Sequence, residues 1–158
     1  METVLEVENL YVEYRTEEEL VRAVNGISLE VLKGENLGLV GETGAGKTTT
    51  ALTIMGLLPP EVSVVRQGRV LFKHVDLITQ SESYLRSVRG NGIGMVFSDP
   101  MTSLNPVLTV GEQIAEVLHL HYTEMSSEDV EDRVNEILSM VGIPPQRKNE
   151  YPHQFSGG

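Results

Sequence analysis

The residues from Gly41 to Thr48, which read GETGAGKT, are the part of this sequence best suited to bind a phosphate chain. They match the pattern GxxxxGK[ST] at every fixed position, namely Gly41, Gly46, Lys47 and Thr48. Glycines let the backbone fold tightly enough to point several amide groups inward, and the lysine ammonium is expected on the β and γ phosphates. The threonine hydroxyl is expected to be a ligand of a magnesium ion. The spacing therefore predicts a P-loop that binds a nucleoside triphosphate with Mg²⁺.

The segments on either side of this loop are those that a P-loop requires. Residues Asn36 to Val40 form a short, largely apolar run that is typical of a buried strand, and residues Thr48 to Leu57 are predicted to form a helix. The N-terminus of that helix would add its partial positive charge to the phosphate site. The order of strand, loop and helix favours a P-loop over an ordinary glycine-rich turn.

Composition limits the kinds of protein that this chain can be. The chain has 158 residues, 40% of them apolar, which suits one domain with a sizeable core. The net charge of −11 arises mostly from residues Met1 to Glu30, with eight acids and two bases, and from Thr109 to Gly142, with eight acids and one base. Because this charge repels phosphate backbones, nucleic acid is not expected as a partner.

The same composition bears on the compartment of the protein. The sequence contains no cysteine, which excludes disulfides and thiolate metal sites and fits a cytosolic protein. No secretory signal is visible at the N-terminus, and no apolar run approaches the ~20 residues that a membrane helix needs. Any role at a membrane is therefore expected to depend on a partner protein.

The N-terminal part of the chain is predicted to form strands. Apolar residues alternate nearly regularly with polar ones over the first fourteen positions, which indicates one or two half-buried strands. Arg15 to Glu19 are predicted to form a charged turn. Leu20 to Val24 and Ile27 to Val31 are predicted to be two further strands, joined by a hairpin turn at Asn25-Gly26.

The middle of the chain offers a second candidate for the magnesium site. Gly68 to Phe72 are predicted to form a strand and Ser81 to Arg89 a short polar helix, and Gly92 to Phe97 are predicted to be a buried strand. An apolar strand that ends in an acid is also how P-loop proteins present the carboxylate that helps to hold magnesium, so Asp99 is a candidate. Ser98, the proline that follows Asp99 and the lack of a second acid speak against this role. On local sequence the alternative stays open.

Two amphipathic helices are predicted in the last third of the chain. Thr109 and Glu112 form a Thr-x-x-Glu capping box at the start of the first helix. The apolar face of this helix is predicted to consist of Ile114, Val117, Leu118 and His121. The second helix is expected to begin at Ser126 or Ser127 and to end at Gly142. Its apolar stripe is predicted to consist of Val130, Val134, Ile137, Leu138 and Val141.

Three segments together resemble the ATP-binding subunits of ABC transporters, and in particular those of oligopeptide, dipeptide or nickel importers. GETGAGKTT at Gly41 to Thr49 is similar to the Walker A motif of that family. GMVFSDPMTSLNP at Gly94 to Pro106 is similar to its Q-loop region, and YPHQFSGG at Tyr151 to Gly158 is similar to the start of its signature motif. The final serine and two glycines would be a weak signal alone, but the resemblance spans essentially the whole chain.

The resemblance implies a fold of the α/β class. It implies a P-loop NTPase core with an N-terminal antiparallel β subdomain and a helical subdomain, truncated before the Walker B strand of the family. Residues 1–158 would form a partial ABC nucleotide-binding domain. Its expected parts are the β subdomain at 1–35, the P-loop core at 36–98, and the Q-loop and helical subdomain at 99–158.

The resemblance also implies which residues bind ATP and Mg²⁺. Tyr14 would stack on the adenine, because an aromatic face suits a base. The expected nucleotide contacts are Tyr14, Gly41, Glu42, Thr43, Gly44, Ala45, Gly46, Lys47, Thr48 and Thr49. Thr48 and Ser98 are expected beside the metal, and Ser98 to Pro106 are expected to form the lever to transmembrane subunits. On this view Asp99 is not the magnesium carboxylate. The residues expected against the γ phosphate held by a partner subunit are Ser156, Gly157 and Gly158.

The implied activity is an ABC-type transport ATPase that couples MgATP binding and hydrolysis to the uptake of peptides or nickel. The protein would be cytoplasmic and peripheral on the inner face of the cell membrane. Its partners would be transmembrane permease subunits and a second, identical or different, ATP-binding subunit, in a head-to-tail dimer with two ATPs between the subunits.

Two departures from the family pattern limit this expectation. The Q-loop glutamine of the family is Ser98 here, whose side chain is shorter. The Walker B aspartate, catalytic glutamate and switch histidine of the family would lie beyond Gly158, so the 158-residue fragment alone is expected to be inactive.

One alternative is a nucleotide-binding or interaction module without turnover. Another is a P-loop kinase or GTPase, but no guanine-reading NKxD string occurs.

Overall fold

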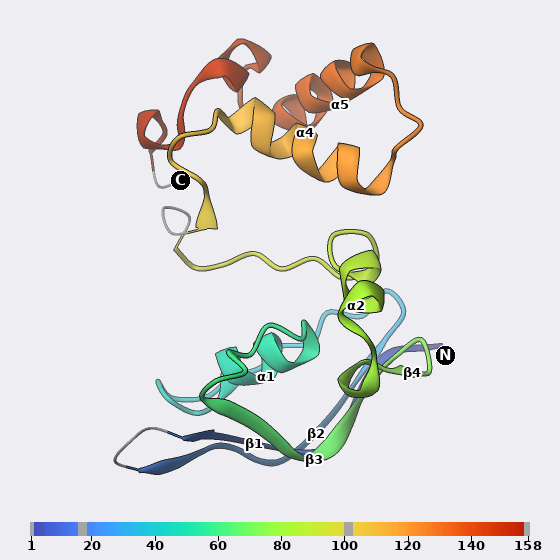
Figure 1. The fold of residues 1–158 in the computed structure, drawn as a ribbon, viewed down its shortest axis with the longest axis vertical. Coiled ribbons are helices and arrows are strands. Elements are labelled where there is room, and N and C mark those ends of the chain that lie inside the picture. The colour runs from blue at the N-terminus through green and yellow to red at the C-terminus, as the bar shows by residue number, and fades with distance from the viewer. Residues whose placement is uncertain (1, 16–18, 100–102, 157–158) are drawn as a thin grey trace. The chain divides into compact units, whose positions relative to one another are not determined.

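The computed structural model describes residues 2–15, 19–99 and 103–156. By their internal contacts they form two compact units, Met1–Arg89 and Gly90–Gly158, and each is described by itself (Figure 1). Both helices and strands are present, as the predicted α/β class requires. The expected subdomain boundaries after residues 35 and 98 remain predictions. Within the described ranges, no helix is long and apolar enough to cross a bilayer.

The first unit is built on a four-stranded sheet. Its strands are β1 (Thr3–Arg15), β2 (Leu20–Leu32), β3 (Ser63–Phe72) and β4 (Val75–Asp76). The strand order is β2-β1-β3-β4, and every neighbouring pair is antiparallel. The predictions of strands in the first fourteen residues and at Gly68 to Phe72 are thereby confirmed. Most of the predicted turn between β1 and β2, residues 16–18, lies outside the described residues.

The predicted hairpin turn at Asn25-Gly26 is wrong. Residues 20–32 form one continuous strand, in which Ile27 pairs with Leu10 and Asn25 pairs with Tyr11, so that Gly26 is left over. Gly26 has φ 75°, and a Cβ placed there would lie 2.6 Å from the Tyr11 hydroxyl oxygen. The dipeptide therefore forms a β-bulge, because pairing with β1 on both sides keeps the chain in the sheet.

Helix α1 (Lys47–Ile54) packs against β2 and β3 on one side of the sheet (Figure 1). It confirms the predicted helix at Thr48 to Leu57, although it ends three residues earlier. Its buried side chains include Thr50 and Thr53, whose hydroxyls donate to the carbonyls four residues before them at 2.9 and 2.7 Å. The other buried apolar side chains of this unit are Val7, Leu10, Val12, Val24, Met55, Val70 and Leu77.

The two predicted buried strands at Asn36 to Val40 and at Gly92 to Phe97 are not formed. The first segment is exposed throughout, and the second contributes only an isolated bridge at Ile93. Val40 and Val96 are 94% and 96% exposed. A strand needs a neighbouring strand for its backbone hydrogen bonds, and the described sheet ends at β2 and β4 without including either segment. The apolar pattern alone could not supply that pairing.

The first unit closes with short elements after the sheet. They are the 3-10 helix η1 (Leu77–Thr79) and helix α2 (Glu82–Val88), and α2 confirms the predicted polar helix. Ser81 caps α2, and Arg89 follows its last turn. The Arg89 guanidinium donates to the carbonyls of Met55 and Gly56 at 2.8 and 2.7 Å, which attaches α2 to the C-terminal end of α1.

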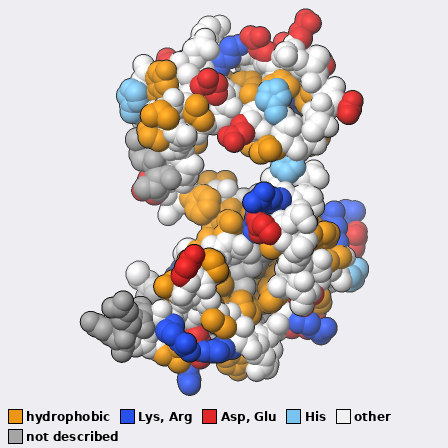
Figure 2. Space-filling model, in the orientation of Figure 1, with side chains coloured by type: hydrophobic (Ala, Val, Ile, Leu, Met, Phe, Trp, Pro, Cys, Tyr) orange, Lys and Arg blue, Asp and Glu red, His pale blue; other side chains and the backbone are white. Residues whose placement is uncertain are grey.

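The second unit is helical. Its elements are α4 (Val110–His121), α5 (Ser127–Met140), and the 3-10 helices η2 (Pro145–Asn149) and η3 (Pro152–Gln154). Both predicted caps are present as capping boxes, Thr109 with Glu112 and Ser126 with Asp129. Figure 2 shows Asp and Glu side chains spread over the face of this unit that it presents, as the acidic sequence predicts.

The core of the helical unit confirms most of the predicted stripes. Its buried residues are Leu118, Val130, Val134 and Leu138, packed against Val110, Ile114, Ala115, Met125 and Ile143. Val117 and Val141 were also expected in the core, but they are 45% and 67% exposed. Val141 is exposed because α5 ends at Met140, and the chain then turns through Gly142 with φ 77°.

Candidate nucleotide-binding site

The predicted P-loop is a glycine-rich turn that leads directly into α1. Gly44 and Gly46 have φ 82° and 83°, a conformation that costs a residue with a side chain energy. Gly41 has a negative φ, but a Cβ there would lie 3.1 Å from the Ala45 Cβ. Two of the glycines thus serve the backbone conformation, and the third allows the two sides of the loop to approach each other.

The end of the loop is fixed to the sheet at Gly46. A Cβ on Gly46 would lie 2.3 Å from the Ala23 carbonyl oxygen and 3.3 Å from a methyl carbon of Val24. No side chain fits in that space, so the loop backbone lies directly against β2. This close approach sets the position at which α1 begins.

The N-terminus of α1 is open to an anion. Gly46, which has no side chain that could cap the first amides, occupies the N-cap position, and the first turn, from Lys47 to Thr50, contains no acidic residue. The free amide groups and the helix dipole therefore present positive charge at this end. The loop encloses a cavity of about 320 Å³ lined by Thr43, Gly44, Ala45, Gly46, Lys47, Thr48 and Thr49.

Lys47 lies over this loop. Its ammonium donates two hydrogen bonds, to the carbonyl oxygens of Gly41 and Glu42, both at 2.6 Å. The carbonyls hold the charge at the loop, where it can attract a phosphate chain. Because an ammonium has three donors, it can also bind phosphate oxygens there. The donor set thus suits a nucleotide phosphate chain, and the exposed Thr48 adds a hydroxyl oxygen of the kind that magnesium binds.

Tyr14, the predicted adenine contact, belongs to the same unit as this loop. It lies near the end of β1, is half-buried and pairs with Val21 of β2. Val21 is two residues from Ala23, whose carbonyl oxygen faces Gly46, and this separation is about 7 Å along a strand. The sheet therefore brings the strand end that bears Tyr14 close to the end of the P-loop.

The other predicted site residues belong to the second unit. Ser98 and Asp99 are exposed, and the Asp99 carbonyl accepts a hydrogen bond from the Ser103 hydroxyl at 2.6 Å. Ser156 is exposed and lies two residues after the end of η3, whereas Gly157 and Gly158 lie outside the described residues. The proposed roles of these residues at the metal and at a partner's ATP stay predictions.

A second cavity, of about 310 Å³, lies in the helical unit between α4, α5 and Lys148. The Lys148 ammonium there is paired with the Glu131 carboxylate and with the side-chain oxygen of Asn135. The hydrogen bond from Lys148 lowers the pKa of Glu131, which keeps the carboxylate ionised. With its cation already neutralised, this cavity is a poorer phosphate site than the P-loop.

Sequence reasoning overlooked two arginines that hold the site elements in place. Arg89 binds the C-terminal end of α1, and Arg147 binds the segment that precedes Ser156. The spacing of Arg147 and Glu150, three residues apart, was a sequence signal for one of these contacts. The contacts of Arg89 with Met55 and Gly56 span more than 30 positions and had no local signal.

Comparison with known proteins agrees with this geometry. The family model described as ABC transporter matches residues 24–158. The chain is 49% identical over its whole length to the dipeptide transport ATP-binding protein DppD of Bacillus subtilis, and it covers 48% of that protein. It is 45% identical, over 98% of its length, to the oligopeptide transport ATP-binding protein OppD of the same organism, of which it covers 43%. The chain thus spans about half the length of these curated relatives.

Solved structures show the same fold. The chain matches a dimeric bacterial ABC transporter cassette with a TM-score of 0.84 and 27% identity, over 97% of this chain and 63% of that one. It matches a dimeric post-hydrolysis state of an ATP-binding cassette bound to ADP and phosphate with a TM-score of 0.80 and 25% identity, over the same shares of the two chains. The family match, the relatives and the phosphate-binding loop agree, and the chain belongs to the ABC transporter family.

Proposed function

We propose that the chain binds MgATP at its P-loop and acts in an ATP-binding subunit that powers the import of peptides. The observation that carries this proposal is the Lys47 ammonium held over the loop by two carbonyls, beside an α1 N-terminus without a side-chain cap. The similarity to dipeptide and oligopeptide transport ATP-binding proteins supports peptides as the transported class. Nickel remains the alternative cargo.

Each residue of the proposed site has one task. Lys47 and the amides of the loop bind the phosphates, and Tyr14 stacks on the adenine. Thr48 contributes its hydroxyl to the magnesium ion, with Ser98 as the second candidate near the metal. Magnesium would neutralise phosphate charge, and these side chains would orient the triphosphate around it.

The proposed partners follow from the same family. A second ATP-binding subunit would meet the ATP of this chain, and the exposed Ser156, with Gly157 and Gly158, would contact the γ phosphate of the partner's ATP. Both related structures are dimeric cassettes, which supports this arrangement. Permease subunits in the membrane would bind this cytoplasmic, peripheral subunit and use the energy of hydrolysis.

The test is calorimetric titration of the protein with MgATP. Lys47→Ala is expected to weaken MgATP binding at least about a hundredfold, because it removes a charged group that binds the phosphates directly. The fold should persist, since within the described part of the chain the Lys47 ammonium forms hydrogen bonds only with two exposed loop carbonyls. Circular dichroism of the variant is the control for folding. Unchanged affinity in a folded Lys47→Ala variant would refute the site.

A second candidate function is nucleotide binding without turnover. The observation that favours it is Ser98, which stands where the family has a glutamine that reaches the attacking water. Phosphate release measured with the intact subunit and its membrane partners separates the two candidates, because the 158-residue fragment alone is expected to be inactive under both. Binding that depends on Lys47 without phosphate release would support the binding module, and turnover that depends on Lys47 would support the ATPase.

A further inference from the structure

Arg147 of η2 makes an unusual set of contacts for a half-exposed arginine. Its Nε and Nη2 atoms donate to one carboxylate oxygen of Glu150 at 2.9 and 2.6 Å. Nη2 also donates to the Gln154 carbonyl oxygen at 3.1 Å, and the guanidinium carbon lies 4.2 Å from the centre of the Phe155 ring. One guanidinium thereby contacts three residues across the six-residue segment from Glu150 to Phe155.

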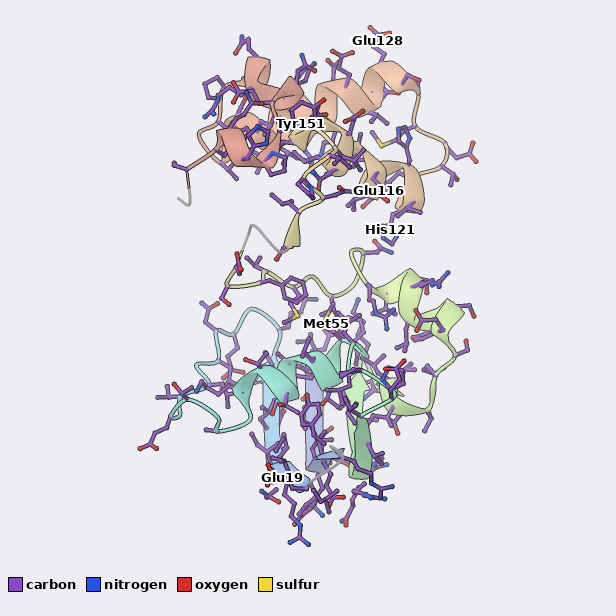
Figure 3. The ribbon with its side chains drawn as sticks, turned by 60° about the vertical axis from the view of Figure 1, so that its left-hand side comes forward. Glu19, Met55, Glu116, His121, Glu128 and Tyr151 are labelled. Atoms are coloured by element: carbon purple, nitrogen blue, oxygen red, sulfur yellow. The ribbon has the colours of Figure 1, made fainter. Side chains whose placement is uncertain are left out.

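The same segment is attached to the helical unit on its other side. The amide of Val110, the first residue of α4, donates to the Glu150 carbonyl oxygen at 2.9 Å, and Pro152 is buried. The amide of Tyr151 donates to the Gln154 side-chain oxygen at 2.8 Å. Figure 3 labels Tyr151 in the helical unit, where the segment returns to the beginning of α4. These contacts hold the segment from Glu150 to Phe155 in place on the helical unit.

Ser156 immediately follows the segment from Glu150 to Phe155. Phe155 is extended, with φ −99° and ψ 148°, so the backbone has left the 3-10 conformation of η3 before it reaches the exposed Ser156. A hydroxyl binds a phosphate on another molecule more tightly if its backbone is already fixed in the bound orientation, because less conformational entropy is lost on binding. Orientation of this backbone therefore bears directly on the proposed contact with a partner's ATP.

We propose that Arg147 is a positioning residue that fixes the direction of Ser156 for binding the triphosphate held by a second ATP-binding subunit. This inference rests on the proposed function, since it requires that Ser156 contacts the partner's ATP. It gives Arg147, which lies outside both the P-loop and the Ser-Gly-Gly sequence, a role in ATP-dependent dimerisation. Arg147 itself does not touch the nucleotide.

The simpler view is that Arg147 forms an ordinary surface ion pair, and the chain contains a matched example of one. Arg133 on α5 pairs with Glu136, also three residues ahead, and the two arginine side chains are similarly exposed, at 44% for Arg133 and 36% for Arg147. Among the described residues the Arg133 guanidinium forms no hydrogen bond, ion pair or cation–π contact with the Glu150 to Phe155 segment. Exposed pairs of this kind contribute little. Arg133→Met is therefore the control for Arg147→Met.

The experiment compares wild type, Arg147→Met, Arg147→Lys and Arg133→Met in the intact subunit as the cell makes it. Methionine keeps an aliphatic stem but removes the charge and the donors, and lysine keeps the charge without the planar fork. Two quantities are measured: MgATP affinity by calorimetry, and MgATP-dependent dimerisation by analytical ultracentrifugation. Circular dichroism and thermal unfolding check the fold of each variant.

Arg147→Met is expected to weaken MgATP-dependent dimerisation at least about tenfold while MgATP affinity changes less than about twofold. Arg147→Lys is expected to recover part of the dimerisation, because an ammonium can still reach one of the acceptors, and Arg133→Met is expected to match wild type. Equal loss of MgATP affinity and dimerisation in Arg147→Met would indicate a general structural role and overturn the inference.

The remaining outcomes separate this inference from the function on which it rests. A wild type that dimerises with MgATP, together with an Arg147→Met variant that dimerises equally well, would refute the inference alone. A loss in Arg133→Met as large as that in Arg147→Met would also refute it. A wild type that does not bind MgATP through Lys47, or binds it without ever dimerising, would refute the proposed assembly and this inference with it.

Discussion

At the scale of single residues, the candidate site depends on where a side chain is absent as much as on where one is present. Gly44 and Gly46 have nearly the same positive φ, but their surroundings differ. Among the described residues, no heavy atom beyond its chain neighbours lies within 4 Å of a Cβ placed on Gly44, whereas a Cβ on Gly46 would lie 2.3 Å from the Ala23 carbonyl oxygen. A substitution at Gly44 therefore tests backbone strain alone. A substitution at Gly46 tests backbone strain together with the close approach of the loop to β2.

This difference gives a prediction with a built-in control. Gly44→Ala is expected to cost about 1 kcal/mol of stability, the penalty of a left-handed conformation, and to keep most MgATP binding. Gly46→Ala is expected to cost more than that and to abolish MgATP binding, because the loop must move away from β2. Urea unfolding and calorimetry check both variants. Equal effects of the two substitutions would show that the contact with Ala23 is unimportant.

At the scale of elements, the helical unit is organised by caps whose residues are close in sequence. The Ser126 hydroxyl accepts a hydrogen bond from the Asp129 amide at 3.1 Å and donates to the Asp129 carboxylate at 2.6 Å. The neighbouring Ser127 is the first residue of α5 and has no part in this cap. Because α5 supplies Val130, Val134 and Leu138 to the core, the start of this helix bears on the stability of the whole unit.

Replacing the two serines in turn tests this cap. Ser126→Ala is expected to lower the free energy of unfolding by about 1 kcal/mol, because it leaves an amide of the first turn without a partner. Ser127→Ala is expected to change it by less than about 0.5 kcal/mol. Urea unfolding followed by circular dichroism measures both. A larger loss for Ser127→Ala would contradict the assignment of Ser126 as the cap.

At the scale of the whole molecule, the surplus of acids makes stability depend on pH. The Arg89 side chain lowers the pKa of Glu82, and hydrogen bonds from Thr109 lower the pKa of Glu112. Hydrogen bonds from Lys148 and from Arg147 lower the pKa values of Glu131 and Glu150. In each case the pKa of the glutamate is lower in the folded state than in the unfolded chain, where it is about 4.3, so folding favours the ionised carboxylate.

The sign of the resulting pH dependence follows from these lowered pKa values. The stabilisation is fully present above the unfolded pKa of about 4.3 and is lost as the pH falls through the folded pKa values below it. The urea midpoint is therefore expected to change little from pH 7 to about 5.5 and to fall below about pH 4. Glu150→Gln should weaken this fall more than Glu128→Gln, a change at an exposed position of α5 (Figure 3). A midpoint that rises on acidification would contradict the prediction.

The sequence by itself determined the features whose parts are close along the chain. The helix after the glycine-rich loop and the capping box at Thr109 were predicted correctly. The cap of α5 was narrowed to Ser126 or Ser127, and α5 ends two residues before the turn predicted at Gly142. Each depends on hydrogen bonds or backbone angles within a few residues, so the local residue types are sufficient. The family was also predicted from local strings.

Only the tertiary structure decided the features that depend on distant partners. The segment at Asn36 to Val40 has the composition of a strand but no partner strand within the described sheet, whereas Asn25-Gly26 has the composition of a turn but is held in β2 by its pairing with β1. The contact of Gly46 with Ala23 and the contact of Arg147 with Phe155 likewise follow from packing. A residue pattern states what a segment can form, and the available hydrogen-bond partners decide what it does form.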